Sequence, residues 1–435
     1  MELPPAFTLV GGFLLPYSSM KQKELLVVVG GGAAGFFCAV NAARMAPQLR
    51  VLLLERSAKL LSKVKVSGGG RCNVTHACFD IDAFSRNYYR GSRFVRKALH
   101  RFFVTDTIAW FEQRGVRLKT EADGRMFPVT DQSQTIIDCL LREAEKYAVE
   151  VRLHTDVTGL QRAGDGWQVY INANQQPLKA RFVCVATGGY PKAAQFAWLQ
   201  DTQHTLVPPV PSLFTFNVPN NAITQLMGVT VPLVTVKVQG SKLRQSGPLL
   251  ITHWGFSGPA ILRLSAAGAR ELHDGGYHFH LLVNWLHEAT EAEVKQRFQA
   301  LRTDKGAATV LRSNPFSLPQ RLWEYLVQQA GIAAPTRWAE LQAALQNRLV
   351  QLLVQGSFEV QGKTTFKEEF VTAGGIDLKE VDANTMQSRI APGLYFAGEV
   401  LDVDGVTGGF NFQHAWTSGY IAAADIARRV VQPAL

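Results

Sequence analysis

A glycine-rich turn near the start of the chain has the residue types and spacing of a dinucleotide-binding site. The motif Gly30-x-Gly32-x-x-Gly35 follows the apolar run 24–30 and opens a predicted helix over 33–45. Such glycines permit a tight turn, close approach of a pyrophosphate to the backbone, and close packing of helix on strand. The helix N-terminus offers free amide groups to the phosphates. Glu55, at the end of the predicted strand 50–55, can accept hydrogen bonds from an adenosine ribose.

The far end of the chain favours FAD over NAD. The sequence contains no second G-x-G-x-x-G motif, and a further glycine- and acid-rich turn, 398–409 (GEVLDVDGVTGG), precedes a predicted helix over 410–431. NAD needs only the first half of a Rossmann fold, whereas FAD extends further and its ring must meet later segments. The N-terminus of that helix would face the flavin pyrimidine edge, where negative charge develops on reduction. We therefore predict non-covalent FAD, with NADH or NADPH as the candidate electron donor.

Several motifs together resemble those of a known family. They are SGGGRCN (67–73), TGG (187–189), THWGFSGP (252–259), TAGG (372–375) and the turn 398–409. With them the chain resembles the BaiN/YhiN-like bacterial flavoproteins, FAD-dependent oxidoreductases related to the fumarate reductase flavoprotein superfamily. The motifs extend from residue 30 to about residue 419, so the resemblance covers nearly the whole chain.

The resemblance implies an α/β fold with a Rossmann-like FAD-binding domain built from both chain ends. It also implies a middle insertion, a small β-barrel domain carrying a helical subdomain. The domain limits predicted from composition and pattern are 1–20 (N-terminal tail), 21–206 (first part of the FAD-binding domain), 207–285 (inserted β-barrel-like domain), 286–355 (helical subdomain) and 356–435 (return strands and C-terminal part of the FAD-binding domain). The proline-rich run 207–211 (VPPVP) is predicted to be the stiff crossing into the insertion.

Roles for individual residues also follow from the resemblance. Ser67–Gly70 should pass along the ribityl chain and ring, Gly188 should help to close the pyrophosphate region, Glu399 and Asp404 should face ribityl and phosphate atoms, and 409–411 should meet the ring. The predicted cofactor-binding set is Gly30, Gly32, Ala33, Ala34, Gly35, Glu55, Arg56, Ser67, Gly68, Gly69, Gly70, Asn73, Val157, Thr187, Gly188, Gly398, Glu399, Asp404, Gly408, Gly409, Phe410 and Asn411. One segment departs from the family: 190–195 (YPKAAQ) stands where many relatives carry a longer glycine-rich element, so contacts expected from that element are in doubt.

Reduction of a C=C or C=O bond by a flavin needs a proton donor and a group that polarises the acceptor. Arg71 and Arg125 are candidate polarising cations, and His253 is a candidate donor. Each has a structural alternative: an ion pair for Arg71, a surface position for Arg125, and a hydrogen-bonded structural role for His253. His414, near the start of the last helix, is a candidate contact of the flavin ring.

Two further functions compete with an NAD(P)H-driven reductase of an organic acceptor, such as an activated C=C bond. Cys72 and Cys78 follow the second strand, where flavin disulfide reductases carry their redox pair, although their spacing is unlike C-x-x-C. Arg86, Arg90, Arg93 and Lys97 form a basic stripe if the predicted helix 83–114 continues through Gly91. That stripe is either a solvated face or the surface of a flavin-bound sensing protein that binds nucleic acid or an acidic partner.

Composition bounds these alternatives. The 435 residues carry a formal net charge of +10, which attracts phosphates, acidic substrates or nucleic acid. Five cysteines without a C-x-x-C pair indicate neither a disulfide framework nor a metal site, and they favour a cytoplasmic location. No stretch approaches the length of a membrane-spanning helix. We read residues 1–20 as a tail rather than a targeting segment, since their start lacks positive charge.

Overall fold

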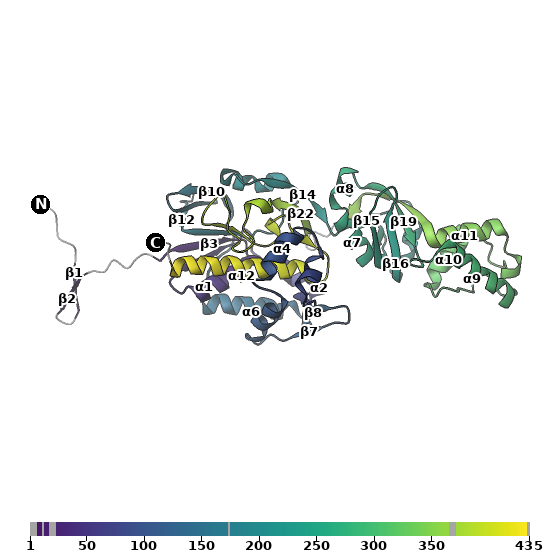
Figure 1. The fold of residues 1–435 in the computed structure, drawn as a ribbon, viewed down its shortest axis with the longest axis horizontal. Coiled ribbons are helices and arrows are strands. Elements are labelled where there is room, and N and C mark those ends of the chain that lie inside the picture. The colour runs from purple at the N-terminus through teal and green to yellow at the C-terminus, as the bar shows by residue number, and fades with distance from the viewer. Residues whose placement is uncertain (1–6, 11–12, 17–22, 173–174, 365–370, 433–435) are drawn as a thin grey trace.

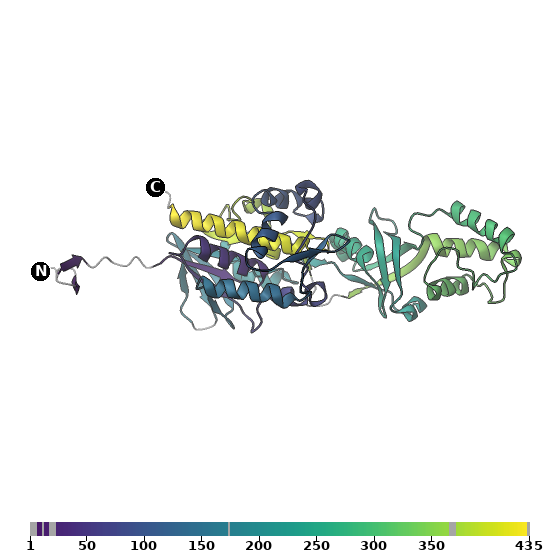
Figure 2. The same cartoon turned by 90° about the horizontal axis from the view of Figure 1, so that it is seen from below.

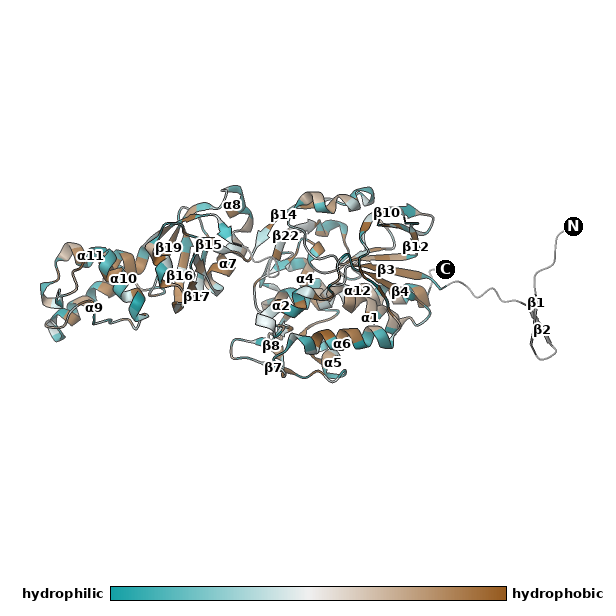
Figure 3. Cartoon of the chain, turned by 180° about the vertical axis from the view of Figure 1, so that it is seen from behind, coloured by the Kyte–Doolittle hydropathy of each residue, from teal (hydrophilic) through white to brown (hydrophobic). Residues whose placement is uncertain are grey.

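Five short strands, of which four are mostly apolar, form the parallel sheet at the centre of the larger unit. They are β3 (Leu25–Val29), β4 (Arg50–Leu54), β9 (Glu150–Arg152), β13 (Phe182–Val185) and β23 (Leu394–Phe396), in the order β23-β13-β3-β4-β9. Figure 3 shows β3 and β4 as hydrophobic over most of their length. The side chains of β13 and β23 are buried throughout, which requires cover on both faces of the sheet.

The computed structural model describes residues 7–10, 13–16, 23–172, 175–364 and 371–432. Helices α1 (Ala33–Met45) and α12 (Phe410–Val431) pack side by side on one face of the parallel sheet (Figure 1). They come from opposite ends of the sequence, so both chain ends build the Rossmann unit, as predicted. Gly419 allows the close approach: a Cβ added there would lie 2.6 Å from the Ala34 carbonyl oxygen.

The other elements of this unit flank the sheet or its carboxyl edge. The helices are α2 (Ser62–Gly70), α3 (Ile81–Ser85), α4 (Ser92–Leu99), α5 (Val104–Glu112), α6 (Ser133–Lys146), η1 (Ala193–Thr202), η4 (Leu378–Glu380) and η5 (Gly398–Val400). The three-stranded sheets are β5 (Thr75–His76), β7 (Leu118–Thr120) and β8 (Arg125–Pro128), and β10 (Val157–Ala163), β11 (Gly166–Ile171) and β12 (Leu178–Ala180). The two-stranded pairs are β6 (Tyr88–Arg90) with β24 (Asp404–Gly405), and β14 (Leu206–Ser212) with β22 (Val371–Ile376).

A second unit with its own apolar core extends from the side of the first (Figure 2). Its antiparallel sheet contains β15 (Thr215–Asn217), β16 (Thr230–Val238), β17 (Arg244–Ile251), β18 (Gly255–Ser257), β19 (His278–Asn284), β20 (Gly356–Gln361) and β21 (Lys363–Thr364). Its helices are η2 (Ala222–Leu226), α7 (Pro259–Ala267), α8 (Ala269–Asp274), α9 (Glu291–Asp304), α10 (Gln320–Gln329), η3 (Trp338–Glu340) and α11 (Ala343–Gln355). The strand-then-helix order of the insertion agrees with the pattern in the sequence.

One local prediction was wrong. The predicted helix 83–114 is instead α3, β6, α4 and α5, because Gly91 adopts a left-handed conformation (φ +75°) and begins α4 anew. The basic stripe that needed one continuous helix therefore does not form. The run 207–211, predicted as a stiff crossing, is part of β14, which pairs with β22 through a register shift between Val207 and Val210 and precedes the first strand of the inserted sheet. The shift spans two prolines, which cannot donate to a ladder.

At the N-terminus, the predicted tail contains β1 (Phe7–Val10) and β2 (Phe13–Pro16), which pair with each other; the rest of 1–20 lies outside the described residues. Within the described part of the chain, none of the helices has the length and apolarity needed to cross a bilayer.

Candidate functional site

The predicted cofactor residues collect at the carboxyl ends of the parallel strands. Gly30 follows β3, Glu55 follows β4, Thr187 follows β13, and Gly398 follows β23. Because these four strands are adjacent and parallel, their carboxyl ends meet at one edge of the sheet. In open α/β sheets this edge is where ligands bind.

The glycine turn shows why each of its glycines is needed. A Cβ at Gly35 would lie 1.9 Å from the Gly30 carbonyl oxygen, and one at Gly30 would lie 2.4 Å from the Ala186 carbonyl oxygen. Both glycines therefore serve close packing. A Cβ at Gly32 would instead meet nothing within 4 Å, so this position borders open space. Gly32 precedes the first turn of α1, which has no side-chain cap, so its amides are available to a phosphate group.

Glu55 is held in place by the backbone around it. Its Oε2 accepts a hydrogen bond from the Gly31 amide and its Oε1 accepts one from the Ser57 amide, both at 2.9 Å. A carboxylate oxygen can accept more than one hydrogen bond, so both oxygens keep the capacity to bind ribose hydroxyls.

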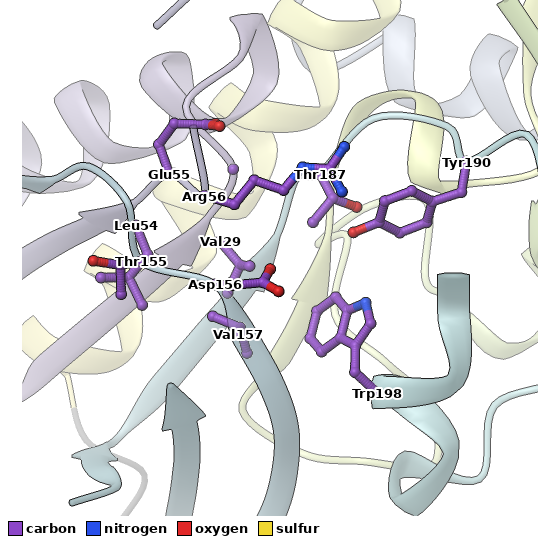
Figure 4. A pocket seen from close by; sticks show the side chains of 11 residues that line it. Val29, Leu54, Glu55, Arg56, Thr155, Asp156, Val157, Thr187, Tyr190 and Trp198 are labelled. Carbon is purple, nitrogen blue, oxygen red and sulfur yellow. The ribbon is translucent and has the colours of Figure 1, made fainter. Parts of the chain in front are cut away.

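A pocket beside Glu55 brings five predicted residues together: Gly30, Glu55, Arg56, Val157 and Thr187. Sequence reasoning missed six other lining residues: Val29, Leu54, Thr155, Asp156, Tyr190 and Trp198. Figure 4 shows Tyr190 and Trp198 on the opposite side of the pocket from Glu55 and Thr155. The sequence could have indicated Thr155 and Asp156, since they follow β9, the edge strand of the parallel sheet. Tyr190 belongs to the segment 190–195 that departs from the family pattern, Trp198 follows three residues after it, and both supply aromatic surface to the pocket.

The SGGG segment turns sharply where it meets α12. Ser67, Gly68 and Gly69 have non-helical backbone angles within α2, and a Cβ at Gly69 or Gly70 would meet nothing within 4 Å. The loop therefore offers bare backbone to open space. The side-chain amide nitrogen of Asn73 donates a hydrogen bond to the Thr75 carbonyl oxygen, and its side-chain oxygen accepts one from the Gly409 amide, each at 3.0 Å. Asn73 thus ties this loop to the start of α12.

His414, on α12, is a buried polar group without a partner. The residue is 2% exposed, and neither ring nitrogen has a hydrogen-bond partner among the described residues. Burial lowers the pKa of its imidazole to about 4, so the ring is neutral at physiological pH. A buried ring nitrogen without a partner is costly unless a ligand satisfies it. Together with the open positions at Gly32, Gly69 and Gly70, it fits an extended polar ligand such as FAD.

The two late carboxylates have different surroundings. Glu399 Oε2 accepts a hydrogen bond from Lys63 Nζ at 2.5 Å, and its Oε1 accepts one from the Thr372 amide at 2.9 Å, so Glu399 stays at the edge of the site. Asp404 is fully buried, where it forms an ion pair with Arg90 and accepts a hydrogen bond from Ser212 Oγ at 2.8 Å. These contacts join Asp404 to β6 and β14.

The two candidate catalytic arginines share one carboxylate. Arg71 Nη1 lies 2.6 Å from Glu121 Oε1, and Arg125 Nη2 lies 2.9 Å from Glu121 Oε2. The Arg71 guanidinium also stacks over the Phe127 ring at 4.0 Å. Arg71 therefore connects the SGGG loop to the β7–β8 hairpin, and Arg125, itself in β8, holds Glu121 from within that hairpin. His253 lies apart, exposed in the turn between β17 and β18, where its ring packs edge-on against Trp254 at 4.3 Å.

His76 is a functional candidate that sequence reasoning missed. Its Nδ1 lies 2.9 Å from the Gly408 carbonyl oxygen, and its ring stacks on Phe410 at 4.7 Å. A carbonyl oxygen only accepts, so Nδ1 donates to it, while Nε2 packs against the hairpin turn, where a Cβ at Gly124 would lie 2.5 Å away. No motif marked this histidine, because its position depends on the C-terminal turn, more than 330 residues away.

The thiols give no support to disulfide chemistry. All five cysteines are free, and Cys72 is completely buried. Burial raises the pKa of the Cys72 thiol to about 12, so almost none of it is thiolate at neutral pH.

A two-ended Rossmann unit with an open glycine cradle defines the class of protein, an FAD-dependent oxidoreductase. The chain belongs to the HI0933-like family, because the profile described as "HI0933-like protein Rossmann domain" matches residues 24–425. The family's Rossmann domain implies FAD, and the resemblance predicted from the motifs is confirmed.

Curated relatives match along almost their full length. The chain is 30% identical over 421 residues to the ribosomal RNA dihydrouridine synthase of Haemophilus influenzae, covering 94% of this chain and 100% of that protein. It is 32% identical over 415 residues to the enzyme of the same name from Escherichia coli (92% and 97%). It is 28% identical over 412 residues to the 3-dehydro-bile acid delta(4,6)-reductase of Clostridium scindens (92% and 98%). The chain is therefore an enzyme of a reductase family.

Among solved structures, a 3-ketosteroid delta1-dehydrogenase from Sterolibacterium denitrificans is similar with a TM-score of 0.50 and 12% identity. The match covers 92% of this chain and 99% of that one. At this identity the likeness concerns the fold alone.

Two glycine variants separate cofactor binding from folding. Gly32→Val should leave the stability of the apoprotein nearly unchanged, because the added side chain enters open space, and should weaken FAD binding at least ~10-fold by filling the phosphate cradle. Gly35→Ala should lower the free energy of unfolding by ~1–3 kcal/mol, because its Cβ meets the Gly30 carbonyl. Flavin fluorescence quenching and urea unfolding measure the two effects. Unchanged FAD affinity in Gly32→Val would contradict this assignment of the cradle.

Buried His414 should make the stability of the apoprotein depend on pH. Its folded pKa of about 4 lies below the ordinary value of 6.5, so its contribution is complete above pH 6.5 and is lost as pH falls toward 4. Between pH 7 and pH 5 this one group should lower the free energy of unfolding by about 2 kcal/mol. Urea unfolding of wild type and His414→Gln at both pH values measures the difference. An equal pH dependence in the two proteins would show that His414 is not the cause.

Proposed function

We propose that this enzyme reduces the C5=C6 double bond of uracil in RNA, with NADH or NADPH as the electron source. The supporting observation is the nearly full-length similarity to two proteins named ribosomal RNA dihydrouridine synthase. The formal charge of +10 suits a polyanionic substrate. The bile-acid reductase among the relatives has a different substrate but shares the reduction of a C=C bond, so the bond type is the common element.

The chemistry is addition of hydride and a proton across a double bond conjugated to a carbonyl group. Bound FAD supplies the hydride, which originates from NAD(P)H. Hydride adds at uracil C6 and the proton adds at C5. Negative charge develops on the C4 carbonyl oxygen when hydride adds, and the site must stabilise that charge. One NAD(P)H and one proton are consumed for each dihydrouracil formed.

Residues of this chain then have separate tasks. Gly32 and the first turn of α1 bind the pyrophosphate, and Glu55 binds the ribose of the adenosine. Arg71 and Arg125 position the SGGG loop through Glu121. His76 donates the proton from Nε2, because its Nδ1 proton is engaged by the Gly408 carbonyl.

The proposal for the inserted unit is a closed β-barrel, formed by the strands within 207–285 together with the return strands β20 and β21, and a helical subdomain over 286–355. Supporting closure, the end strands of the sheet, β20 and β21, are consecutive in the chain and separated by Gly362 alone. Gly362 has a φ of +89°, which lets one segment bend and pair with β19 on one side and β15 on the other.

The reaction can be tested on unmodified ribosomal RNA transcribed in vitro. FAD-loaded enzyme with NADPH or NADH should produce RNA fragments with a mass gain of two hydrogens per reduced uracil. NADPH or NADH without RNA should bleach the flavin absorbance under anaerobic conditions. The Gly32→Val variant is the control without cofactor. Turnover of a 3-keto-4,6-diene bile acid, with RNA left unmodified, would assign the enzyme to that substrate class. Redox-dependent RNA binding with neither turnover would favour the sensing function instead.

His76 should affect only the half-reaction that reduces substrate. His76→Gln should slow that half-reaction by ~10²-fold or more, while the rate of flavin reduction by NAD(P)H stays unchanged, because only the former needs a proton donor. His278→Gln, an exposed histidine on β19, is the matched control. Equal rates of substrate reduction for His76→Gln and wild type would exclude His76 as the donor.

A further inference from the structure

The segment 79–101 carries a run of positive charge that the active-site chemistry does not use. No Asp or Glu occurs from 83 to 105, whereas six basic residues do: Arg86, Arg90, Arg93, Arg96, Lys97 and Arg101. The fold separates these six into two groups. Arg90 turns inward to the buried Asp404, and the other five are exposed.

Helix α4 presents most of that charge on one face. Phe94, Val95, Ala98 and Leu99 are buried, while Arg93, Arg96 and Lys97 are exposed on the opposite side. Of the five exposed cations, only Arg96 has an ion-pair partner among the described residues, the equally exposed Asp82. The remaining positive charge faces solvent without compensation.

Helix stability does not account for this placement. Cations in the last turn of a helix interact favourably with its macrodipole, which covers Arg96 and Lys97. Arg93 lies in the first turn, where a positive charge is unfavourable, and that turn contains no acidic residue. A cation kept at such a position suits an anionic ligand.

The exposed cations of α4 lie on a helix that packs directly on the turn 402–410. A Cβ at Gly91 would lie 2.6 Å from Val403 Cγ2, so the start of α4 packs on that turn. Strand β6 pairs with β24, and Tyr88 Oη donates to the Phe410 carbonyl oxygen at 2.6 Å. Phe79, three residues after His76, is 58% exposed and offers an aromatic face at the start of the same segment.

We propose that Arg86, Arg93, Arg96, Lys97 and Arg101 bind the phosphate backbone of single-stranded RNA, and that Phe79 stacks on a base beside the uracil to be reduced. The inference rests on the proposed function and assigns its substrate-docking surface. Cations track the backbone and an exposed aromatic ring holds a splayed base, which is the pattern of single-strand recognition. The direct packing of α4 on the turn 402–410 directs the bound strand to the site.

A charge-matched pair of triple variants tests the surface. Arg86→Gln, Arg93→Gln and Lys97→Gln together should raise the Kd of the FAD-loaded enzyme for a uridine-rich single-stranded RNA at least ~10-fold and reduce the slope of log Kd against log salt by about 2. The control triple, Arg297→Gln, Lys305→Gln and Arg348→Gln, removes the same charge from exposed positions of the helical subdomain and should change neither quantity. Phe79→Ala should weaken binding about tenfold with an unchanged salt slope, since stacking is not ionic.

The outcomes separate this inference from the proposed function. If the wild type reduces uracil in RNA but both triple variants bind RNA alike, the docking surface is wrong and the function stands. If the wild type forms no dihydrouracil, the function itself fails. If the first triple loses binding to phosphatidylserine vesicles and keeps its affinity for RNA, the surface is a lipid contact and the proposal is overturned.

Discussion

The packing of α12 against α1 is the constraint on which the cofactor site depends. These helices come from opposite chain ends, and their contact, together with the parallel pairing of β23 with β13, brings the turn 398–409 beside the glycine turn. Gly419 makes the contact possible, because any Cβ there would meet the Ala34 backbone. The Trp416 indole fixes the register, donating to the Val74 carbonyl oxygen at 2.9 Å while it packs on Phe37. The contact between Gly419 and Ala34 therefore also sets the distance between the N-terminus of α1 and the turn 398–409.

The elements that depend on local sequence patterns were predictable from the sequence. The glycine spacing, the buried runs of β3 and β4, and the helices α1 and α12 follow from periodicity and from the steric needs of a tight turn. These features depend on contacts close in sequence or on general sheet geometry. The same reasoning brought Gly30, Glu55, Arg56, Val157 and Thr187 to one pocket.

The part that depends on long-range contacts was not predictable. His76 gains its role only from Gly408, and Arg71 and Arg125 converge only because the hairpin carries Glu121 to the SGGG loop. The helix predicted over 83–114 failed at Gly91, whose left-handed conformation is favoured by its packing on Val403. In each case the partner lies far along the chain, where neither propensity nor periodicity carries information about it.

Arg90 shows how such a break serves the site. Once the chain leaves the helical path at β6, Arg90 reaches the buried Asp404 and also donates to the Ala266 carbonyl oxygen at 2.7 Å, in the inserted unit. Ser212 binds the same carboxylate, and the Phe214 amide donates to Ser265 Oγ at 2.9 Å. Polar groups buried at a junction demand defined partners, because leaving one charge unpaired costs several kcal/mol. Apolar contacts alone would tolerate many orientations of the insertion; this network selects one, and Asp404 at its centre belongs to the turn 398–409 itself.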